Sequence, residues 1–368
     1  MPRTGTVDLP PVDGPLGGLV KALNELHAQT GLRLGFAYTT LFQQAGGGPG
    51  DRNGFAGDVD LMSSWTLLGR GTKDTGTFVF TGENRFRQST QPPSALGGVL
   101  GTLTNTTGGF NDRGWVVRDG FWLQRLFEDH VRLLVGRADP SDYVGGHRMQ
   151  SINNSFLNRA FSANASVAYP SGHVPTAGIS VLPNDLCYVT FGAANGYGTS
   201  NTINVDSLKY GDFFWFGEFG LTPKIDGLGQ GRYRVLLWRM DAREEINLPQ
   251  DQGISVILEQ DFGDQFLAFA RYSYSDADLT NIQNAVQGGV GYRGLLGSPD
   301  NLTGFAGSYA QPPSGGGRDE TVFEIFQRWQ LTRQTQFTLG AQLILNPSNS
   351  PTNADAVGVF EARLRVAF

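Results

Sequence analysis

Apolar and polar residues alternate at every second position over much of this chain. In the last twelve residues, Phe360, Leu364 and Phe368 fall on one parity, and Arg363 and Arg365 fall on the other. Successive side chains of a β-strand point to opposite faces, so this segment has one apolar face and one charged face. A slip of one residue would exchange the two faces, and the pattern therefore specifies the register of the strand.

Sixteen segments carry strand patterns of this kind. They are 31–41, 57–69, 76–87, 115–127, 131–139, 173–182, 186–197, 211–222, 231–241, 253–262, 265–275, 285–296, 301–309, 320–332, 335–346 and 356–368. Short turns alternate with long loops between them, which is typical of bacterial outer-membrane barrels. The sequence thus predicts an all-β fold, a transmembrane antiparallel β-barrel of about 16 strands. The facing of the fourth, fifth and seventh strands is left open.

The charged parity is assigned to the lumen. Arg or Lys on the lipid face of a barrel costs roughly 2–4 kcal/mol at the midplane of the bilayer. Closure of the barrel also removes the sheet edges that lipid would leave without hydrogen bonds. We therefore expect Phe360, Leu364 and Phe368 to face lipid, and the terminal aromatic to lie in the interfacial girdle.

The first thirty residues differ from the rest of the chain. Apolar residues recur at helical spacing from Leu16 to Leu26, which predicts a short amphipathic helix ending near Gly31. The sequence divides into an N-terminal periplasmic segment at 1–30 and the barrel at 31–368. No secretory signal is visible in residues 1–14, so an outer-membrane location requires a signal peptide outside this sequence.

Composition narrows the function classes. The formal charge of -6 argues against nucleic acid as a partner, because a basic stripe would be expected there. The single cysteine, Cys187, excludes an internal disulfide framework and a cysteine-cluster metal site. Asp241, Glu244 and Glu245 form an acidic run, for which a solvated loop is the favoured interpretation over a divalent-cation site. No cofactor or metal is predicted.

Several blocks of the chain resemble the carbohydrate-selective porins of the OprB type. They are the helix followed by Thr30–Thr39, the block Gly57–Leu61, Tyr169–Gly172 before a strand, Asn195–Tyr197, Glu320–Glu324, Leu345–Pro347 and Asp355–Val357. The resemblance runs over most of the chain, and its last block is the most specific. It implies a sixteen-stranded barrel with an inward-folded third loop that passes sugars passively. The chain looks short for that family.

The loop 140–172 follows the fifth strand, so it is the third external loop. The resemblance implies that it folds into the lumen and narrows it; a loop lying on the rim is the alternative. Its polar residues, with aromatic residues between them, suit a solute rich in hydroxyl groups. The residues expected at the narrow point are Asp142, His147, Arg148, Asn153, Asn154 and Arg159.

Charged residues on the luminal parity of the strands complete the expected solute-binding set. They are Arg85, Arg87, Arg328, Arg363, Arg365, Glu324 and Glu361. The five arginines are expected to meet in one basic arc when the barrel closes, and such an arc favours anions or neutral polar solutes. The alternative interpretation is that these charges pair along the wall and satisfy one another.

Passive diffusion of small polar solutes, above all carbohydrates, is the predicted function. The arginines leave organic acids as an alternative, because guanidinium binds carboxylate in a bidentate manner. A barrel enzyme is the second alternative, with Ser171 and His173 as its only local candidates; a soluble sandwich is the remaining one. The expected partners are outer-membrane lipids, lipopolysaccharide and the solute. The sequence leaves open whether the protein is a monomer or a homotrimer.

Overall fold

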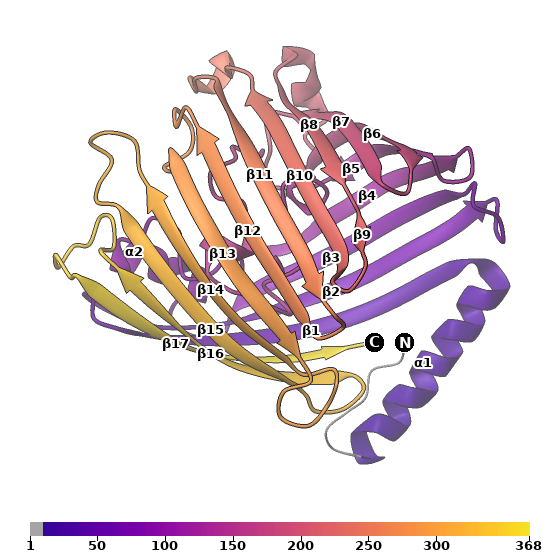
Figure 1. Cartoon of the computed structure of the whole chain (residues 1–368), viewed down its shortest axis with the longest axis horizontal. Coiled ribbons are helices and arrows are strands. Elements are labelled where there is room, and N and C mark those ends of the chain that lie inside the picture. The colour runs from indigo at the N-terminus through magenta and orange to yellow at the C-terminus, as the bar shows by residue number, and fades with distance from the viewer. Residues whose placement is uncertain (1–9) are drawn as a thin grey trace.

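Sixteen strands form one closed antiparallel barrel in the computed structural model, which describes residues 10–368 (Figure 1). The strands of the wall are β1 Leu32–Gly46, β2 Asn53–Leu68, β3 Gly76–Arg87, β4 Gly114–Leu126, β5 Val131–Ala138, β6 Val174–Asn184, β7 Cys187–Asn195, β8 Phe213–Leu221, β10 Gly229–Met240, β11 Asp251–Phe262, β12 Phe266–Ser275, β13 Asn284–Arg293, β14 Leu302–Gln311, β15 Glu320–Gln330, β16 Thr335–Leu345 and β17 Ala356–Ala367. The predicted number of strands and their order are confirmed.

The first and last strands close the ring. β1 pairs with β17 from Ala37 opposite Ala367 to Gly46 opposite Gly358, and it also pairs with β2. The two-residue strand β9, Lys224–Ile225, pairs only with β10 inside the turn that joins β8 to β10. Each backbone edge of the wall is therefore hydrogen-bonded, as a sheet in lipid requires.

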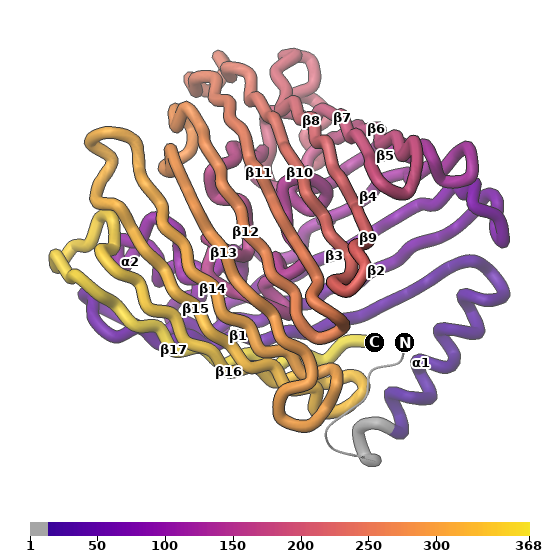
Figure 2. Tube along the Cα trace, viewed as in Figure 1, coloured from indigo at the N-terminus to yellow at the C-terminus, as the bar shows by residue number. Residues whose placement is uncertain are grey.

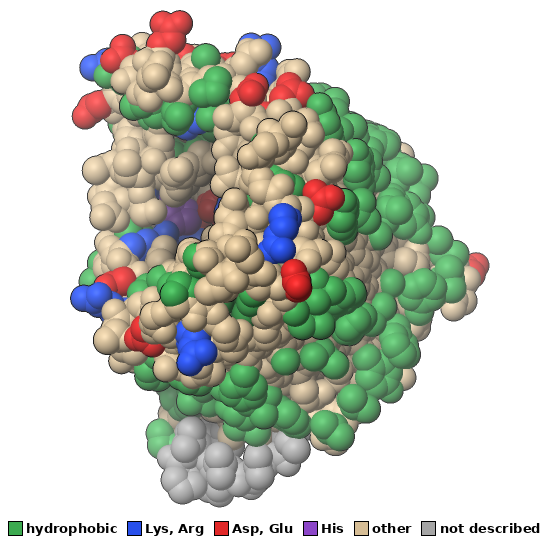
Figure 3. All heavy atoms as spheres, turned by 90° about the vertical axis from the view of Figure 1, so that its left-hand side faces the viewer, with side chains coloured by type: hydrophobic (Ala, Val, Ile, Leu, Met, Phe, Trp, Pro, Cys, Tyr) green, Lys and Arg blue, Asp and Glu red, His purple; other side chains and the backbone are tan. Residues whose placement is uncertain are grey.

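The parity of the side chains agrees with the prediction. Phe360 is 48% exposed and Leu364 is 39% exposed, whereas Glu361 and Arg363 between them are both 2% exposed. Phe368 at the chain end packs against Phe36 of β1, with ring centroids 5.4 Å apart. Figure 3 shows the resulting surface: hydrophobic side chains cover the outer flank, and charged side chains gather in a hollow at one side.

Two local features explain why the fourth and fifth strands show no clean alternation. Against β3, the partner of Thr81 is Asp119 and the partner of Gly82 is Val117, so Arg118 is an extra residue in a β-bulge. In β5, Arg137 shares the outward parity of Val135, which is 60% exposed. The guanidinium of Arg137 does not meet lipid, because the carbonyls of the loop 196–212 accept its hydrogen bonds. In β7, Phe191 is 60% exposed and marks the outward parity.

Helix α1, Pro10–Thr30, stands outside the barrel wall, beside the ends of β1 and β2 (Figures 1 and 2). The helix ends at Gly31, whose φ of 75° suits glycine and whose N–H donates to the carbonyl of His27 at 2.8 Å. Trp65 of β2 donates to the carbonyl of Thr30 at 3.2 Å, and Arg70 donates to that of Gln29 at 3.1 Å. Within residues 10–368, no helix has both the length and the apolar character of a membrane span.

The packed core of this barrel lies inside the lumen. Phe156 and Phe161 from the loop between β5 and β6 pack against each other with tilted rings, centroids 5.3 Å apart. Phe156 also contacts Phe269 of β12 at 5.9 Å and Phe326 of β15 at 5.0 Å, measured between ring centroids. The short helices α2, Leu96–Leu100, and α3, Arg159–Ser162, belong to the loops that fill this space.

Candidate functional site: the luminal passage

The third external loop, residues 139–173, crosses the lumen. It leaves β5 and returns in β6, yet its middle is held by Glu324 of β15, far along the ring. The carboxylate of Glu324 accepts hydrogen bonds from the backbone N–H groups of Leu157 at 2.7 Å and Asn158 at 2.8 Å. These contacts require the loop to lie inside the barrel, so its predicted inward fold is confirmed.

Arginines of the wall bind the carbonyl groups of the same loop. Arg363 of β17 donates from both terminal nitrogens to the carbonyl of Ser155 at 3.0 Å. Arg271 of β12 donates to the carbonyls of Gly145 and Ala160, each at 3.1 Å. A loop has carbonyl and N–H groups that no sheet ladder satisfies, and the charged luminal side chains supply these partners.

A second loop also folds into the lumen, which the sequence reasoning missed. In the loop 88–113, the carbonyl of Thr106 accepts from Gln43 of β1 at 3.0 Å and from Gln342 of β16 at 2.8 Å. Glu361 binds the same two amides, at 3.2 Å and 2.8 Å. Luminal glutamines on the strands were the available signal, because their amides can satisfy a backbone that enters the pore.

The structure places three of the predicted loop residues around a small polar space. Asp142 pairs with Arg118 and is partly open to solvent. Arg148 pairs with Glu259 at 3.2 Å and with Asp261 at 2.9 Å. The space has a volume of about 160 Å³ and is lined by Ser141, Asp142, Tyr143, Gly146, His147, Arg148, Gln150, Arg232 and Arg234.

His147 has a packing role at this point. Its ring stacks on Phe269 with centroids 4.0 Å apart and an interplanar angle of 12°. Burial, followed by the positive charges of Arg271 and Arg234, holds the pKa of His147 well below its usual value of 6.5. The imidazole is therefore neutral at physiological pH, and it contributes a flat face beneath the polar space.

The other predicted loop residues lie farther along the loop. Asn154 accepts from Arg328 through its backbone carbonyl, at 2.8 Å. Asn153 is partly buried, and its side-chain oxygen has no hydrogen-bond partner among the described residues. Arg159 opens helix α3 and is exposed, and no acidic partner of its guanidinium is present within residues 10–368.

The wall residues divide into a buried group and an open group. Glu324, Glu361 and Arg363 are each no more than 2% exposed and lie beneath the loops. Arg87 lies at the outer end of β3, where it pairs with Asp112 at 3.2 Å and stays open to solvent. Arg328 and Arg365 are half-buried between these extremes, and Arg87 is the most open to solvent of these wall arginines.

Acidic residues interrupt the expected basic arc on β2, β3 and β17. Arg85 pairs with Glu83 at 2.7 Å and with Asp58 at 3.4 Å, and Arg365 lies 4.0 Å from Asp60. The three carboxylates lie within 4.8 Å of one another, and Arg113 and Arg118 also pair with Glu83. This part of the wall is therefore a neutralised ion-pair network. The alternation of Asp58 and Asp60 with apolar residues was the signal that could have shown it.

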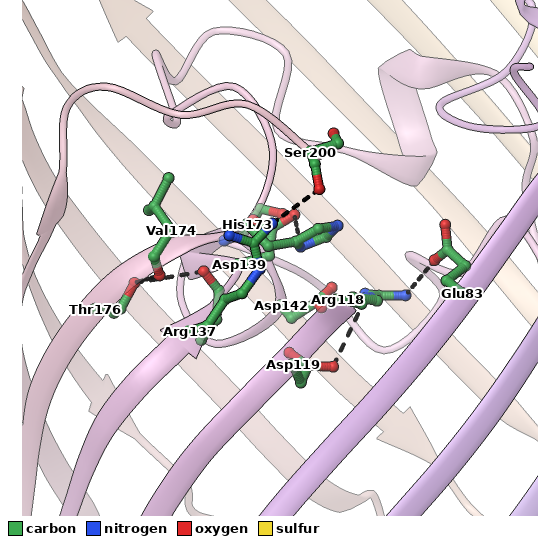
Figure 4. Close-up of polar contacts among 12 residues, drawn as sticks. Glu83, Arg118, Asp119, Arg137, Asp139, Asp142, His173, Val174, Thr176 and Ser200 are labelled. Atoms are coloured by element: carbon green, nitrogen blue, oxygen red, sulfur yellow. Dashed lines mark hydrogen bonds and ion pairs between the residues drawn. The ribbon is translucent and has the colours of Figure 1, made fainter. Parts of the chain in front are cut away.

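Figure 4 shows how charged groups continue from this network to the root of the third loop. Arg118 lies between Glu83 on one side and Asp119 and Asp142 on the other. Beyond them, Nδ1 of His173 lies 3.7 Å from a carboxylate oxygen of Asp139. The ion pairs of the wall thus extend without a break from β2 and β3 to the loop root.

Asp139 makes the stability of the loop root dependent on pH. Burial, followed by the negative charge of Asp142, raises the pKa of Asp139 from 3.8 to about 6. Burial lowers the pKa of His173 to about 2, so that neighbour stays neutral. The folded state favours protonated Asp139, and this stabilisation is complete below pH 3.8 and is lost as the pH rises through about 6.

We expect Asp139→Asn to remove this dependence. Asparagine can still accept the hydrogen bond from the N–H of Ser141, which is 2.9 Å long in the native protein. The thermal unfolding midpoint in detergent, measured at pH 4 and pH 7.5, should fall more in the native protein than in the variant. An equal fall in both proteins would show that Asp139 does not titrate in this range.

The closed barrel, its inward loops and its charged passage define a porin. A family model of the carbohydrate-selective porins, the OprB family, matches residues 65–368, and the chain belongs to that family. It is therefore a non-enzymatic channel, and membership of this family together with the fold places it in the outer membrane. No curated protein matches the chain.

Solved porin structures share the fold at low sequence identity. The high-pH structure of Pseudomonas putida OprB is 14% identical, with a TM-score of 0.77 over 95% of this chain and 97% of that chain. The low-pH structure of the same protein is also 14% identical, with a TM-score of 0.59 and full coverage of both chains. A mutant of the Rh. blastica porin is 10% identical, with a TM-score of 0.54 over 92% of this chain and all of that chain.

Proposed function

We propose that the passage carries small neutral polar solutes, most of all sugars, by passive diffusion. The observation that supports this proposal is the mixed lining of the polar space beside Tyr143. Arg148 and Arg232 supply donors, Asp142 supplies acceptors, and Gln150 supplies both. Sugar hydroxyl groups need donors and acceptors together, and the ring of Tyr143 offers a face to the C–H groups of a sugar.

A second space continues the path beyond Tyr143. It has a volume of about 370 Å³, and Phe121, Tyr143 and Tyr188 are among its lining residues, together with Arg125, Arg132 and Arg232. Tyr143 is 45% exposed and meets Phe121 edge to face, with ring centroids 5.8 Å apart. An aromatic surface followed by guanidinium groups suits a solute that slides along rings while it exchanges hydrogen bonds.

Organic acids are the second candidate class. Arg159 is exposed and has no acidic partner among the described residues, and Arg232 is only loosely paired, 3.8 Å from Glu259. A guanidinium group without a close carboxylate binds the carboxylate of a solute in a bidentate manner. Passage of organic acids depends on the net charge of the pore lining, whereas passage of sugars depends on Tyr143 and on hydrogen-bond donors and acceptors that lie close together.

Solute uptake into liposomes distinguishes the two candidates. We expect glucose to enter faster than gluconate, which has nearly the same size but carries a negative charge. Tyr143→Ala should lower glucose uptake more than gluconate uptake, and Tyr272→Ala, on the outward face of β12, is the matched control. Faster entry of gluconate, with no effect of Tyr143→Ala, would favour the organic-acid porin.

The organisation around the pore completes the proposal. In this proposal, α1 is a separate segment on the periplasmic side and residues 31–368 form the barrel; residues 1–9 of the predicted segment 1–30 lie outside the described residues. The exposed apolar residues of the outer face contact outer-membrane lipids, including lipopolysaccharide on the external side. The homotrimer stays a prediction, which the mass of the detergent-solubilised protein would test.

A further inference from the structure

A groove of about 820 Å³ runs across the outer face of β5, β6, β7, β8 and β10. Its floor contains small residues of three neighbouring strands: Ala177 of β6 lies opposite Ala193 of β7, and Gly217 of β8 also lines the floor. Its sides are larger apolar residues, namely Leu133, Val135, Ile179, Phe191, Trp215 and Leu237. The lining is apolar throughout, except for Arg239.

The groove lies on the face of the wall that meets lipid. Phe191 is 60% exposed and Leu237 is 58% exposed, whereas Leu236, the next residue along β10, is fully buried on the luminal side. The bilayer contains no water that could fill a hollow of this kind, so hydrocarbon must occupy it. The groove is continuous with the apolar surface of the barrel, and its occupant therefore comes from the membrane.

Arg239 gives the groove a charged end. It is the second-last residue of β10, directly before the external loop 241–250, so it stands at the external membrane–water interface. Its Nε lies 3.4 Å from Asp241, and one terminal nitrogen donates to Gln250 at 3.2 Å. Trp215 is opposite Arg239 in the register and donates to Asp241 at 2.8 Å, which places an aromatic ring at the same level.

These observations point to one kind of ligand. We propose that the groove binds an acyl chain of a phosphorylated outer-leaflet lipid, the lipid A part of lipopolysaccharide, and that Arg239 binds the lipid phosphate. The apolar floor accepts the chain, and the other terminal nitrogen of Arg239 can donate to a phosphate oxygen. Acyl chains fit a narrow hollow between larger side chains, whereas a second copy of the barrel would present bulky residues of its own.

The inference rests on the outer-membrane orientation proposed above, but it is independent of the pore. The side chains named above as the floor, sides and charged end of the groove point away from the lumen. Loss of the bound lipid should therefore leave the conductance unchanged. Conversely, a pore with the wrong solute preference would leave lipid binding intact. The two proposals can therefore fail separately.

Native mass spectrometry of the detergent-solubilised protein, with added lipid A, tests the proposal. Ala193→Phe fills the floor of the groove, and Ala270→Phe makes the same change on the outward face of β12, away from the lining of this groove. We expect Ala193→Phe to lower the fraction of barrel with lipid A bound by at least about five-fold, since the acyl chain loses its apolar contact. Ala270→Phe should have no effect.

The charge is tested separately with lipid A and its dephosphorylated form. Arg239→Gln should weaken binding of the phosphorylated lipid and leave the dephosphorylated lipid unchanged, and Arg239→Lys should retain most of the difference. Equal lipid binding by Ala193→Phe and Ala270→Phe would overturn the assigned groove. Dimers or trimers that dissociate in Ala193→Phe would overturn it too, because the face would then be an interface between copies.

Discussion

Removing residues 151–162 of the third loop will raise the single-channel conductance several-fold. This segment carries Phe156 and Phe161, whose rings fill the lumen between the loop and the wall. The excision joins ends that are already close, because Arg271 binds both Gln150 and Ala163. The loop 88–113 stays in the lumen of this variant, but the removed segment opens part of the cross-section, and the open cross-section sets the current.

A deletion at the outer rim is the control for this prediction. Removing 313–316, in the loop between β14 and β15, shortens an exposed loop that carries none of the described anchors of the third loop. Planar-bilayer recordings should show a normal current for that control. Native conductance in a folded protein lacking 151–162 would show that the loop does not limit the current.

A single substitution probes the same loop more gently. Glu324→Ala removes both acceptors that hold Leu157 and Asn158, and each N–H left without a partner costs about 1–3 kcal/mol. We expect the loop to move in and out of its place, so the recordings should show flicker between the native current and larger currents. Glu324→Gln keeps one acceptor and should show less flicker.

Replacing Arg159 and Arg232 by glutamine will shift the ion preference toward cations. Arg159 is exposed and has no acidic partner among the described residues, and Arg232 lines both of the luminal spaces. A charge about 4 Å from a passing ion contributes about 1 kcal/mol in water, or roughly a five-fold change in relative permeability. The reversal potential in a salt gradient measures this shift, which should shrink at 1 M salt, where the Debye length is about 3 Å.

Arg363→Gln removes one positive charge from a buried place, whereas the double variant removes two from less buried places, and it is the contrast. Arg363 is 2% exposed and is occupied by the carbonyls of the third loop, so its loss should alter the steadiness of the current more than the reversal potential. The luminal parity of Arg328 and Arg363 predicted that their charges create the field of the pore. If Arg363→Gln shifts the reversal potential as strongly as the double variant, Arg363 acts mainly through its charge on passing ions. Its hydrogen bonds to the third loop would then be of minor importance for the current.

The alternation of side chains was enough to predict the wall. The side chains of a strand alternate between its two faces, so the sequence of each segment shows which face is apolar. Only an apolar face is stable against lipid, so that face must point outward. The prediction was left open where that rule is locally broken. Arg118 adds a residue to β4, and Arg137 stands on the outward parity under a loop that supplies its acceptors.

The passage could be predicted only in part. The sequence indicated that the third loop enters the lumen, and its Asp142 and Arg148 do line the polar space. It did not indicate that the loop 88–113 enters too, or that Glu324, Glu361 and Arg363 lie beneath these loops. Loops have no periodic sequence pattern from which their path could be predicted. The sequence pattern of a charged luminal residue is also the same whether its side chain contacts water or a backbone carbonyl.

The sequence alone therefore determined the barrel, its sixteen wall strands and the face that each clear strand turns to lipid, because these properties are local and periodic. Only the tertiary structure decided which charges remain open to a solute. That choice depends on contacts between residues far apart in the chain, such as Gln43 with Glu361 and Leu157 with Glu324. Closure of the ring creates these contacts, and burial beneath the loops then leaves residues such as Asp142, Tyr143 and Arg232 as the lining of the passage.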